Sequence, residues 1–380
     1  MQSTGTRLFT ALFGYVTLII LLLTLNPFYL AMPDHVTFTF GSSLKNLILN
    51  IVMFLPVGFF YRLTTKRRGA LVVGACLSFG IETLQLFIPA RTPSILDILT
   101  NTLGAGIGSL AYDLISTRLV LSSATVKQLR LETPLMGLVY LLIPLLWMDV
   151  LALNETPHRW ILTVSLGICG GIIFSDLFRH WLDIVNDRTA AYASLAAGTW
   201  FLIGVGPIVL SSPYLLAIGL GILVFTAIIT LLRPSISDRR FEQNTLKRLI
   251  PIFGLYMALL TLGYPFHSLG TWQVFFGFTN RMSERSLYAI YPRIEYLAAF
   301  TVIGYLLAEW RGRLELSLSQ DLRRLFALIS CIAFTLEILS GFQSGHGASV
   351  VRFMLAVAGG LFGGTIYHLS RAHVRFLLGR

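Results

Sequence analysis

Long apolar blocks separated by short polar stretches run along the chain. Each block holds about 18 to 22 residues, the length that a helix rising 1.5 Å per residue needs to cross a hydrocarbon core of about 30 Å. The pattern predicts an all-α, polytopic transmembrane helix bundle of about twelve spans. The expected spans are Leu8–Ala31, Leu44–Tyr61, Gly69–Ile88, Ser94–Ile115, Pro134–Leu153, Trp160–Phe178, Ala190–Leu210, Pro213–Leu232, Leu249–Pro265, Ile294–Ala308, Leu325–Gly341 and Ser349–Leu369.

The orientation of the chain follows from its Lys and Arg residues, which are enriched in the cytoplasmic loops of membrane proteins. If the N-terminus lies in the cytoplasm, most of the 29 Lys and Arg residues fall in loops on the cytoplasmic side. The first apolar run is long for a cleaved signal peptide, so we interpret it as a span. We therefore expect a multi-pass protein of the inner (plasma) membrane with both termini in the cytoplasm.

The composition supports a chain that is embedded in lipid. Hydrophobic residues make up 55% of it and charged residues only 12%, against about 25% charged residues in a soluble domain. The net charge of +11 could indicate nucleic-acid binding. However, the charges stand in short clusters between apolar blocks, so we expect the lipid bilayer as partner and no nucleic acid.

The sequence carries few signs of cofactor chemistry. Its three cysteines lie far apart inside apolar blocks, which predicts neither a disulfide nor a metal site. It shows no nucleotide-binding loop, metal-ligand cluster or nucleophile elbow. We therefore expect no cofactor and no metal.

The chain contains an internal match. Residues 79–114 align with residues 334–369 without a gap, and nine of the 36 pairs are identical. The identical pairs include Glu82/Glu337, Ser94/Ser349, Gly104/Gly359 and Gly108/Gly363. Any two membrane hairpins share apolar letters, but a matched intramembrane Glu with a paired glycine step is harder to obtain by chance. We interpret the match as a parallel repeat, with four-span units at 1–120 and 249–380 and a middle region at 121–248.

Polar residues, which are costly inside a membrane, gather near the outer ends of the second, third and fourth spans. Their spacing of three or four places each set on one helical face. The set comprises Asn50, Glu82, Gln85, Arg91, Ser94, Asp97 and Asn101. We predict that these residues line one polar cavity open to the exterior. Two carboxylates at membrane depth favour a catalytic acid/base pair, Glu82 and Asp97, with the other five binding substrate.

Several of these residues also have a purely structural interpretation. Gly104 and Gly108 form a small-xxx-small step, which favours close helix packing over ligand contact. Asn50 and Asn101 can serve as hydrogen-bonding contacts between helices. Arg91 can be a solvated loop cation, or it can neutralise the two acids in a structural network.

The second copy has lost part of this set. Arg352 stands at the position of Asp97, and Ala356 at that of Asn101. We expect Glu337 and Arg352 to pair, which converts an acidic pocket into a neutralised contact. The second copy is therefore interpreted as one retained for packing.

The first copy resembles the VanZ-like family. The resemblance rests on Asn50-x-x-x-Phe54-x-Pro56-x-Gly58, Glu82-x-x-Gln85, Arg91-x-x-Ser94-x-x-Asp97, Asn101 and Gly104-x-x-x-Gly108. It covers roughly residues 44–114, and the second copy looks like a degenerate VanZ-like unit. The resemblance implies a bacterial cell-envelope membrane protein. The family's namesake accompanies glycopeptide-resistance genes and lowers susceptibility to teicoplanin, so an effect on antibiotic resistance is implied here as well.

Three functions remain open on the sequence alone. In the first, an outward-facing pocket binds or modifies a lipid-linked or glycan substrate of the envelope, with Arg91 placed to meet a phosphate. In the second, the protein is a transporter or flippase of an envelope precursor, as its span number and parallel repeat allow. In the third, it is a non-catalytic membrane scaffold. Whether the protein is an enzyme, and its oligomeric state, are not determined by the sequence.

Overall fold

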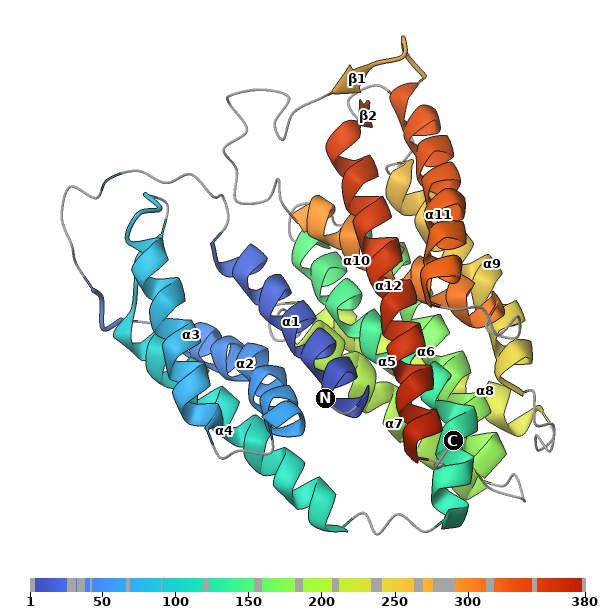
Figure 1. The fold of residues 1–380 in the computed structure, drawn as a ribbon, viewed down its shortest axis with the longest axis horizontal. Helices are drawn as coiled ribbons and strands as arrows, with labels where there is room; N and C mark the ends of the chain where they lie inside the picture. The colour runs from blue at the N-terminus through green and yellow to red at the C-terminus, as the bar shows by residue number, and fades with distance from the viewer. Residues whose placement is uncertain are drawn as a thin grey trace. The chain divides into compact units, whose positions relative to one another are not determined.

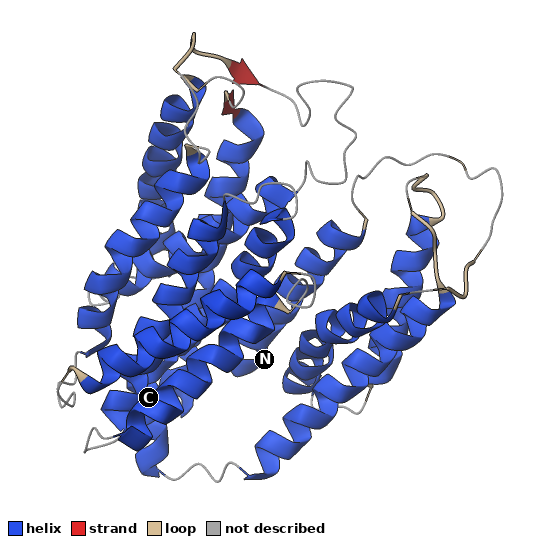
Figure 2. Cartoon of the chain, turned by 180° about the vertical axis from the view of Figure 1, so that it is seen from behind, coloured by secondary structure: helices blue, strands red, loops and turns tan. Residues whose placement is uncertain are grey.

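The computed structural model describes residues 4–25, 32, 38–41, 43–65, 69–89, 91–118, 123–153, 159–181, 187–206, 212–233, 241–262, 269–275, 291–311, 318–343 and 347–377. Within these ranges the chain forms twelve helices and one pair of short strands (Figure 1, Figure 2). The helices are α1 (Thr4–Thr24), α2 (Leu44–Thr65), α3 (Ala70–Gln85), α4 (Ile95–Arg118), α5 (Ser123–Leu153), α6 (Trp160–Trp181), α7 (Asp187–Val205), α8 (Pro213–Leu231), α9 (Phe241–Thr261), α10 (Tyr291–Arg311), α11 (Leu318–Gly341) and α12 (Val350–Leu377). The strands are β1 (Val274–Phe275) and β2 (Ala348–Ser349).

The prediction of an all-α bundle is confirmed. By length and composition, six helices of the described part can cross a bilayer, namely α1, α2, α5, α6, α8 and α12. Helix α3 has 16 residues. At 1.5 Å per residue it is about 24 Å long, which is less than a hydrocarbon core of about 30 Å. The number of twelve spans therefore stays a prediction.

The chain divides into two compact units, each with its own packing. The first comprises residues 1–127 with two short segments, 285–290 and 372–380, and contains α1 to α4. The second comprises residues 128–284 and 291–371 and contains α6 to α11 with most of α5 and α12. The two matching stretches of the sequence thus lie in different units.

Helix α4 shows how one helix serves both lipid and protein contacts. Leu99, Leu103 and Leu110 follow one face and are 59%, 51% and 62% exposed. Asn101 and Ala105 lie on another face and are 3% and 0% exposed. A helix that presents leucines outward and polar or small residues inward is what a bilayer selects, because lipid covers the leucines. The buried face of α4 is the one that carries the predicted site.

Two glycines of α4 bring its backbone against α2. A Cβ on Gly104 would meet the backbone of Ile51, and a Cβ on Gly108 would meet the carbonyl oxygen of Leu55. Such small residues let two membrane helices approach closely. This contact fixes the depth of α4 relative to α2, and with it the depth of Asn101 relative to Asn50.

A tight turn joins α3 to α4. Helix α3 ends at Gln85, three residues before the predicted end of its span, because the N–H of Ile88 bonds back to the carbonyl of Gln85 at 3.0 Å and tightens the last turn. Thr39, from the segment before α2, pairs in parallel with Ser94 at the start of α4. The N–H of Thr39 donates to the carbonyl of Pro93 at 2.8 Å. These bonds hold the first turn of α4 in place.

The second unit contains the same types of contact at the matching positions. Phe275 of β1 pairs in parallel with Ser349 of β2, directly before α12. At the end of α11, the N–H of Gln343 donates to the carbonyl of Ser340 at 3.1 Å. Both contacts are made by residues at equivalent positions of the sequence match, which has an offset of 255. Ser349 aligns with Ser94, and Gln343 aligns with Ile88.

Glycines of α12 approach α10 in the same way. A Cβ on Gly359 would meet the carbonyl of Leu297, and a Cβ on Gly363 would meet the carbonyl of Thr301. Leu297 and Thr301 are four residues apart, as are the two residues of α2 that face the glycines of α4. In this respect α10 and α12 pack as α2 and α4 do.

Candidate functional site

Glu82 is the centre of the predicted site and lies in the last turn of α3. It is 2% exposed, and its Oε2 accepts a hydrogen bond from the backbone N–H of Ser94 at 2.8 Å. Since Ser94 directly precedes α4, Glu82 satisfies one of the donors that a helix N-terminus leaves open. Within the described residues this is the only hydrogen bond of the Glu82 side chain, and the carboxylate forms no ion pair. Most of its capacity as an acceptor is therefore unused.

Two further charged residues act on Glu82. Asp97 stands in the first turn of α4, and Arg91 stands in the turn before it. Both are close enough for their charges to influence the Glu82 carboxyl. The Nη2 of Arg91 donates to the carbonyl oxygen of Leu23 at 3.2 Å, near the C-terminal end of α1, where the helix dipole favours a cation.

Buried amide and hydroxyl groups extend the site along α4 and α2. Asn101 is 3% exposed, and its Nδ2 donates to the Oγ of Ser78 on α3 at 2.9 Å. Among the amide and hydroxyl groups of the predicted site, three buried atoms have no hydrogen-bond partner within the described residues: the Oδ1 of Asn101, the Oγ of Ser94 and the Nδ2 of Asn50. Each such atom costs about 1–3 kcal/mol when nothing satisfies it. Their presence on α2 and at the start of α4, which pack against each other, favours an occupant with polar groups.

Gln85 has a different set of contacts. It is 8% exposed, and its Nε2 donates to the carbonyl oxygen of Thr24 at 2.9 Å. Gln85 and Arg91 thus both hold the end of α1 against the turn between α3 and α4. The structure joins Glu82 directly to Ser94 and brings the charges of Asp97 and Arg91 near it, whereas Gln85 is bonded to α1.

In the second unit the matching glutamate is fully engaged. The backbone N–H of Ser349 donates to Glu337 Oε2 at 2.7 Å. The guanidinium of Arg352 donates to the same carboxylate through Nε at 3.1 Å and through Nη2 at 2.8 Å. Nη2 also donates to Ser340 Oγ at 3.0 Å and to the carbonyl of Gly347 at 2.6 Å. Glu337 and Arg352 therefore form an ion pair within a satisfied network.

The sequence analysis passed over a buried ion cluster in the second unit. Asp149 and Glu295 are each 0% exposed, and the guanidinium of Arg159 binds Glu295 and lies 3.5 Å from Asp149. Tyr256 donates to Glu295 at 3.1 Å, and Thr163 donates to Asp149 at 3.3 Å. The signal was present in the sequence, because both acids stand inside apolar blocks.

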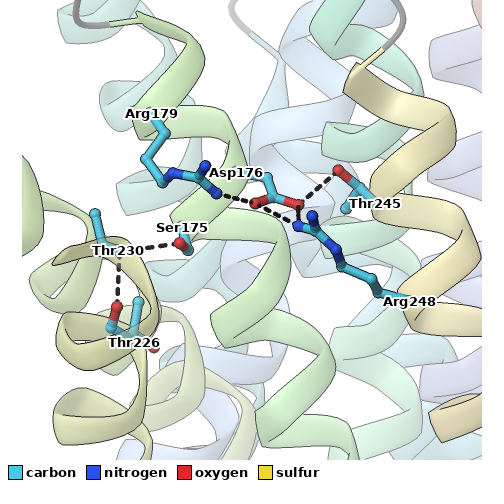
Figure 3. A network of polar contacts seen from close by, with 7 residues as sticks. All are labelled: Ser175, Asp176, Arg179, Thr226, Thr230, Thr245 and Arg248. Atoms are coloured by element: carbon cyan, nitrogen blue, oxygen red, sulfur yellow. Dashed lines mark hydrogen bonds and ion pairs between the residues drawn. The ribbon is translucent and has the colours of Figure 1, made fainter. Parts of the chain in front are cut away.

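A second overlooked network surrounds Asp176 on α6 (Figure 3). Asp176 is 1% exposed and accepts hydrogen bonds from Arg179 at 2.9 Å, from Arg248 at 3.0 Å and from Thr245 at 2.8 Å. Arg179 lies on the same helix, while Thr245 and Arg248 come from α9. A buried acid held by two arginines and a hydroxyl is satisfied by the chain itself, so this network ties α6 to α9.

The Glu82 carboxylate accepts one hydrogen bond within the described residues and can accept others from hydrogen-bond donors. Within the described residues no group of three or more His, Cys, Asp or Glu side chains could hold a metal ion. Costly polar residues held between helices with lipid-facing leucines are the mark of a multi-pass membrane protein, which is the class that the fold and the site define.

Residues 5–116 match the VanZ/LLP1 family model, so this part of the chain is a VanZ-like unit. The resemblance found in the sequence motifs is confirmed for this stretch, which contains the seven predicted site residues of the first copy. The family match ends before the second copy begins. Neither the curated proteins nor the solved structures gave a match to the chain. The family and the apolar helices together indicate a membrane protein associated with the cell envelope.

Proposed function

We propose that the VanZ-like unit forms an outward-facing polar pocket that binds or modifies a lipid-linked or glycan substrate of the bacterial envelope. Glu82 and Asp97 are its acid/base pair, and Asn50, Arg91, Ser94 and Asn101 contact the substrate, with Gln85 positioning the end of α1. The observation that carries the proposal is the buried Glu82 carboxylate, which has one hydrogen bond within the described residues.

The energetics favour an occupant of this pocket. Within the described residues the three buried atoms of Asn50, Ser94 and Asn101 have no partner, and they cost roughly 3–9 kcal/mol together if nothing satisfies them. A purely structural helix contact would gain by replacing such atoms with apolar ones. A substrate that supplies complementary groups recovers this free energy when it binds. The cost is then a property of the empty pocket, as expected for a binding site.

We infer that the protein lies in the inner membrane with both termini in the cytoplasm and about twelve spans. The support comes from the basic loops of the sequence. In this orientation the turn between α3 and α4 faces the exterior, and the ion pair of Arg62 with Asp113, at 2.9 Å, lies at the cytoplasmic end of α2 and α4. The pocket around Glu82 then opens toward envelope substrates.

We also infer that residues 334–369 belong to a degenerate second VanZ-like unit, in a chain organised as 1–120, 121–248 and 249–380. The support is the pair of matching hydrogen bonds, Ser94 to Glu82 and Ser349 to Glu337, at 2.8 and 2.7 Å. The glycine contacts of α4 with α2 and of α12 with α10 add to it. The second unit, with its own Arg352 against Glu337, has a packing role.

The test replaces the two acids conservatively and measures susceptibility to a glycopeptide such as teicoplanin. Glu82→Gln keeps an acceptor for the N–H of Ser94 but removes the charge. Asp97→Asn removes the charge of the acid on α4. Asp113→Asn is the matched control, because it removes a carboxylate from α4 far from the pocket in sequence. Expression of each variant is verified in the membrane fraction.

We expect both pocket variants to lose the effect on susceptibility and the control to keep it. An altered lipid or glycan profile together with this loss supports modification of a substrate. Accumulation of an envelope precursor on one leaflet supports a flippase instead. Wild-type behaviour of Glu82→Gln and Asp97→Asn at normal expression would refute the proposal and leave a non-catalytic scaffold.

A further inference from the structure

Helices α6 and α8 of the second unit pack side by side and run in the same direction. A Cβ on Gly171 of α6 would meet the hydroxyl oxygen of Thr226 on α8. One turn further along both helices, the hydroxyl of Thr230 donates to the hydroxyl oxygen of Ser175 at 3.0 Å (Figure 3). Both helices are long and apolar enough to cross a bilayer. Their last turns therefore lie at the same level.

Each of these two helices carries an arginine at its end. Arg179 follows Ser175 by four residues, and Arg233 follows Thr230 by three. A spacing of three or four keeps a residue on the same helical face, one turn further along. The two arginines thus lie on the faces through which α6 and α8 meet. In agreement with this, the charge of Arg233 acts on the guanidinium of Arg179.

A third arginine comes from α9. The guanidinium groups of Arg179 and Arg248 both donate to the Oδ1 of Asp176, at 2.9 and 3.2 Å, so they lie next to each other (Figure 3). The side chain of Arg248 is 38% exposed, and its charge also acts on Arg179. Arg179, Arg233 and Arg248 are called the arginine group below.

Arg233 carries a donor that the chain leaves unsatisfied. Its Nη1 is buried and has no hydrogen-bond partner among the described residues, and it forms no ion pair with any of them. A guanidinium stays charged in a protein, so it cannot escape this cost by losing a proton. A buried donor without an acceptor is costly, and more so when it is charged. The missing partner is therefore an acceptor, and a negative charge suits it best.

The ends of the helices explain the positive charges only in part. The C-terminal end of a helix favours a cation, which accounts for an arginine at the end of α6 and of α8. It supplies no acceptor for the buried Nη1 of Arg233. The ends of helices that cross a bilayer lie at the depth of the lipid headgroups. Guanidinium groups bind phosphate oxygens in pairs, and basic sites between membrane helices bind anionic headgroups.

We propose that the arginine group binds a phosphate group, with the Nη1 of Arg233 and the exposed part of the Arg248 guanidinium as donors. Arg179 adds its charge while it donates to Asp176. The headgroup of an anionic phospholipid and free inorganic phosphate share this chemistry, and the depth of the site favours the lipid. The site belongs to the second unit and does not depend on the function proposed for the pocket around Glu82.

Thermal unfolding of the full-length protein in mild detergent tests the proposal. All six tryptophans of the sequence belong to the second unit, so their fluorescence reports its unfolding. Dihexanoyl-phosphatidylglycerol is compared with dihexanoyl-phosphatidylcholine, whose phosphate is neutralised by its own cation. Sodium phosphate is compared with sodium chloride at equal ionic strength. We expect a saturable rise of the midpoint by about 4 °C with phosphatidylglycerol and little change with phosphatidylcholine.

Two variants of Arg233 and one control complete the test. Arg233→Gln should lose most of the rise, and Arg233→Lys should keep part of it because the charge remains. Since Arg233 forms no ion pair among the described residues, we expect both variants to fold with an undiminished midpoint when no lipid is added. The control is Arg188→Gln, an exposed arginine at the start of α7 in the same unit, which should keep the full rise.

The outcomes separate the two sources of phosphate and can refute the site. A rise with phosphatidylglycerol that sodium phosphate does not reproduce supports a lipid headgroup. An equal rise with sodium phosphate, and none with sodium chloride, supports free phosphate. Equal shifts with both lipids, no shift with any phosphate, or an undiminished shift in Arg233→Gln would overturn the proposal. The comparison of lipids in the wild type does not depend on the folding of any variant.

Discussion

Replacing Gly108 by alanine should loosen the first unit, because an added Cβ has no space between α4 and α2. It would overlap the carbonyl oxygen of Leu55 and lie 2.9 Å from the carbonyl carbon of Leu55 and 3.0 Å from the backbone N of Phe59. All three atoms are backbone, so no side chain can turn away. Since carbon atoms pack best at about 3.5–4.0 Å, the helices must separate locally by at least about 0.5–1 Å.

The size of the effect follows from this separation. A gap of about 0.5–1 Å removes a quarter to a half of the attraction between two atoms, which is itself about 0.1–0.2 kcal/mol. Over roughly 40 atom pairs, the number that one buried leucine makes, the loss is about 1–4 kcal/mol. The better helix propensity of alanine offsets about 1 kcal/mol. We expect a net decrease of about 0–3 kcal/mol in the free energy of unfolding.

The measurement needs a thiol that is buried in the folded unit, and since Cys76 is exposed the thiol is introduced by Ser78→Cys, at a position of α3 that is 0% exposed. In a background with Cys76→Ala, Cys169→Ala and Cys331→Ala, labelling of the thiol at position 78 by a thiol-reactive dye reports the unfolding of α3. The midpoint for Gly108→Ala should fall by about 5 °C. The control is Gly80→Ala, where an added Cβ meets nothing within 4 Å. An unchanged midpoint for Gly108→Ala, or an equal fall in the control, would contradict the close packing of α2 and α4.

Three further predictions concern the ion pairs. In a double-mutant cycle of Glu337→Gln and Arg352→Met, the coupling free energy should be about 2 kcal/mol, and strictly additive midpoint shifts would argue against the observed pair. Arg159→Met leaves Glu295 buried without its cation, so the protein should lose about 3–5 kcal/mol of stability. The yield of monodisperse protein in detergent should fall accordingly, and a wild-type yield would contradict the cluster. Asp113→Asn removes a partly exposed pair and should change stability by less than about 1 kcal/mol, measured as a nearly constant midpoint.

The helices could be predicted from the sequence because a chain in lipid must satisfy its backbone hydrogen bonds internally. The expected starts at Leu44, Trp160 and Pro213 coincide with the starts of α2, α6 and α8. The end of α3 at Gln85 could not be predicted in the same way. It depends on turn hydrogen bonds between neighbouring residues, whose geometry the apolar pattern does not encode.

The candidate site, too, could be predicted from the sequence only in part. The acids of the first unit stand out as polar residues in apolar blocks, but the hydrogen bond from Ser94 to Glu82 depends on how the turn folds. The same rule applied to the second unit would have found Asp149 and Glu295. Their arrangement would still have remained unknown, because Arg159 and Glu295 are 136 residues apart in the sequence. Composition identifies costly residues, and only the fold shows which of them meet.

The shortness of α3 gives bilayer thickness a consequence for the proposed site if this helix crosses the membrane. With 16 residues, the helix is about 6 Å shorter than a typical hydrocarbon core. Lipid beside a spanning α3 would thin or dimple, at a cost of fractions of a kcal/mol per ångström. Longer acyl chains would bring the hydrocarbon boundary over the Glu82 end of the helix, and shorter ones would leave that end in contact with water. In that case the surrounding lipid, and not the polypeptide alone, would set the access to this carboxylate.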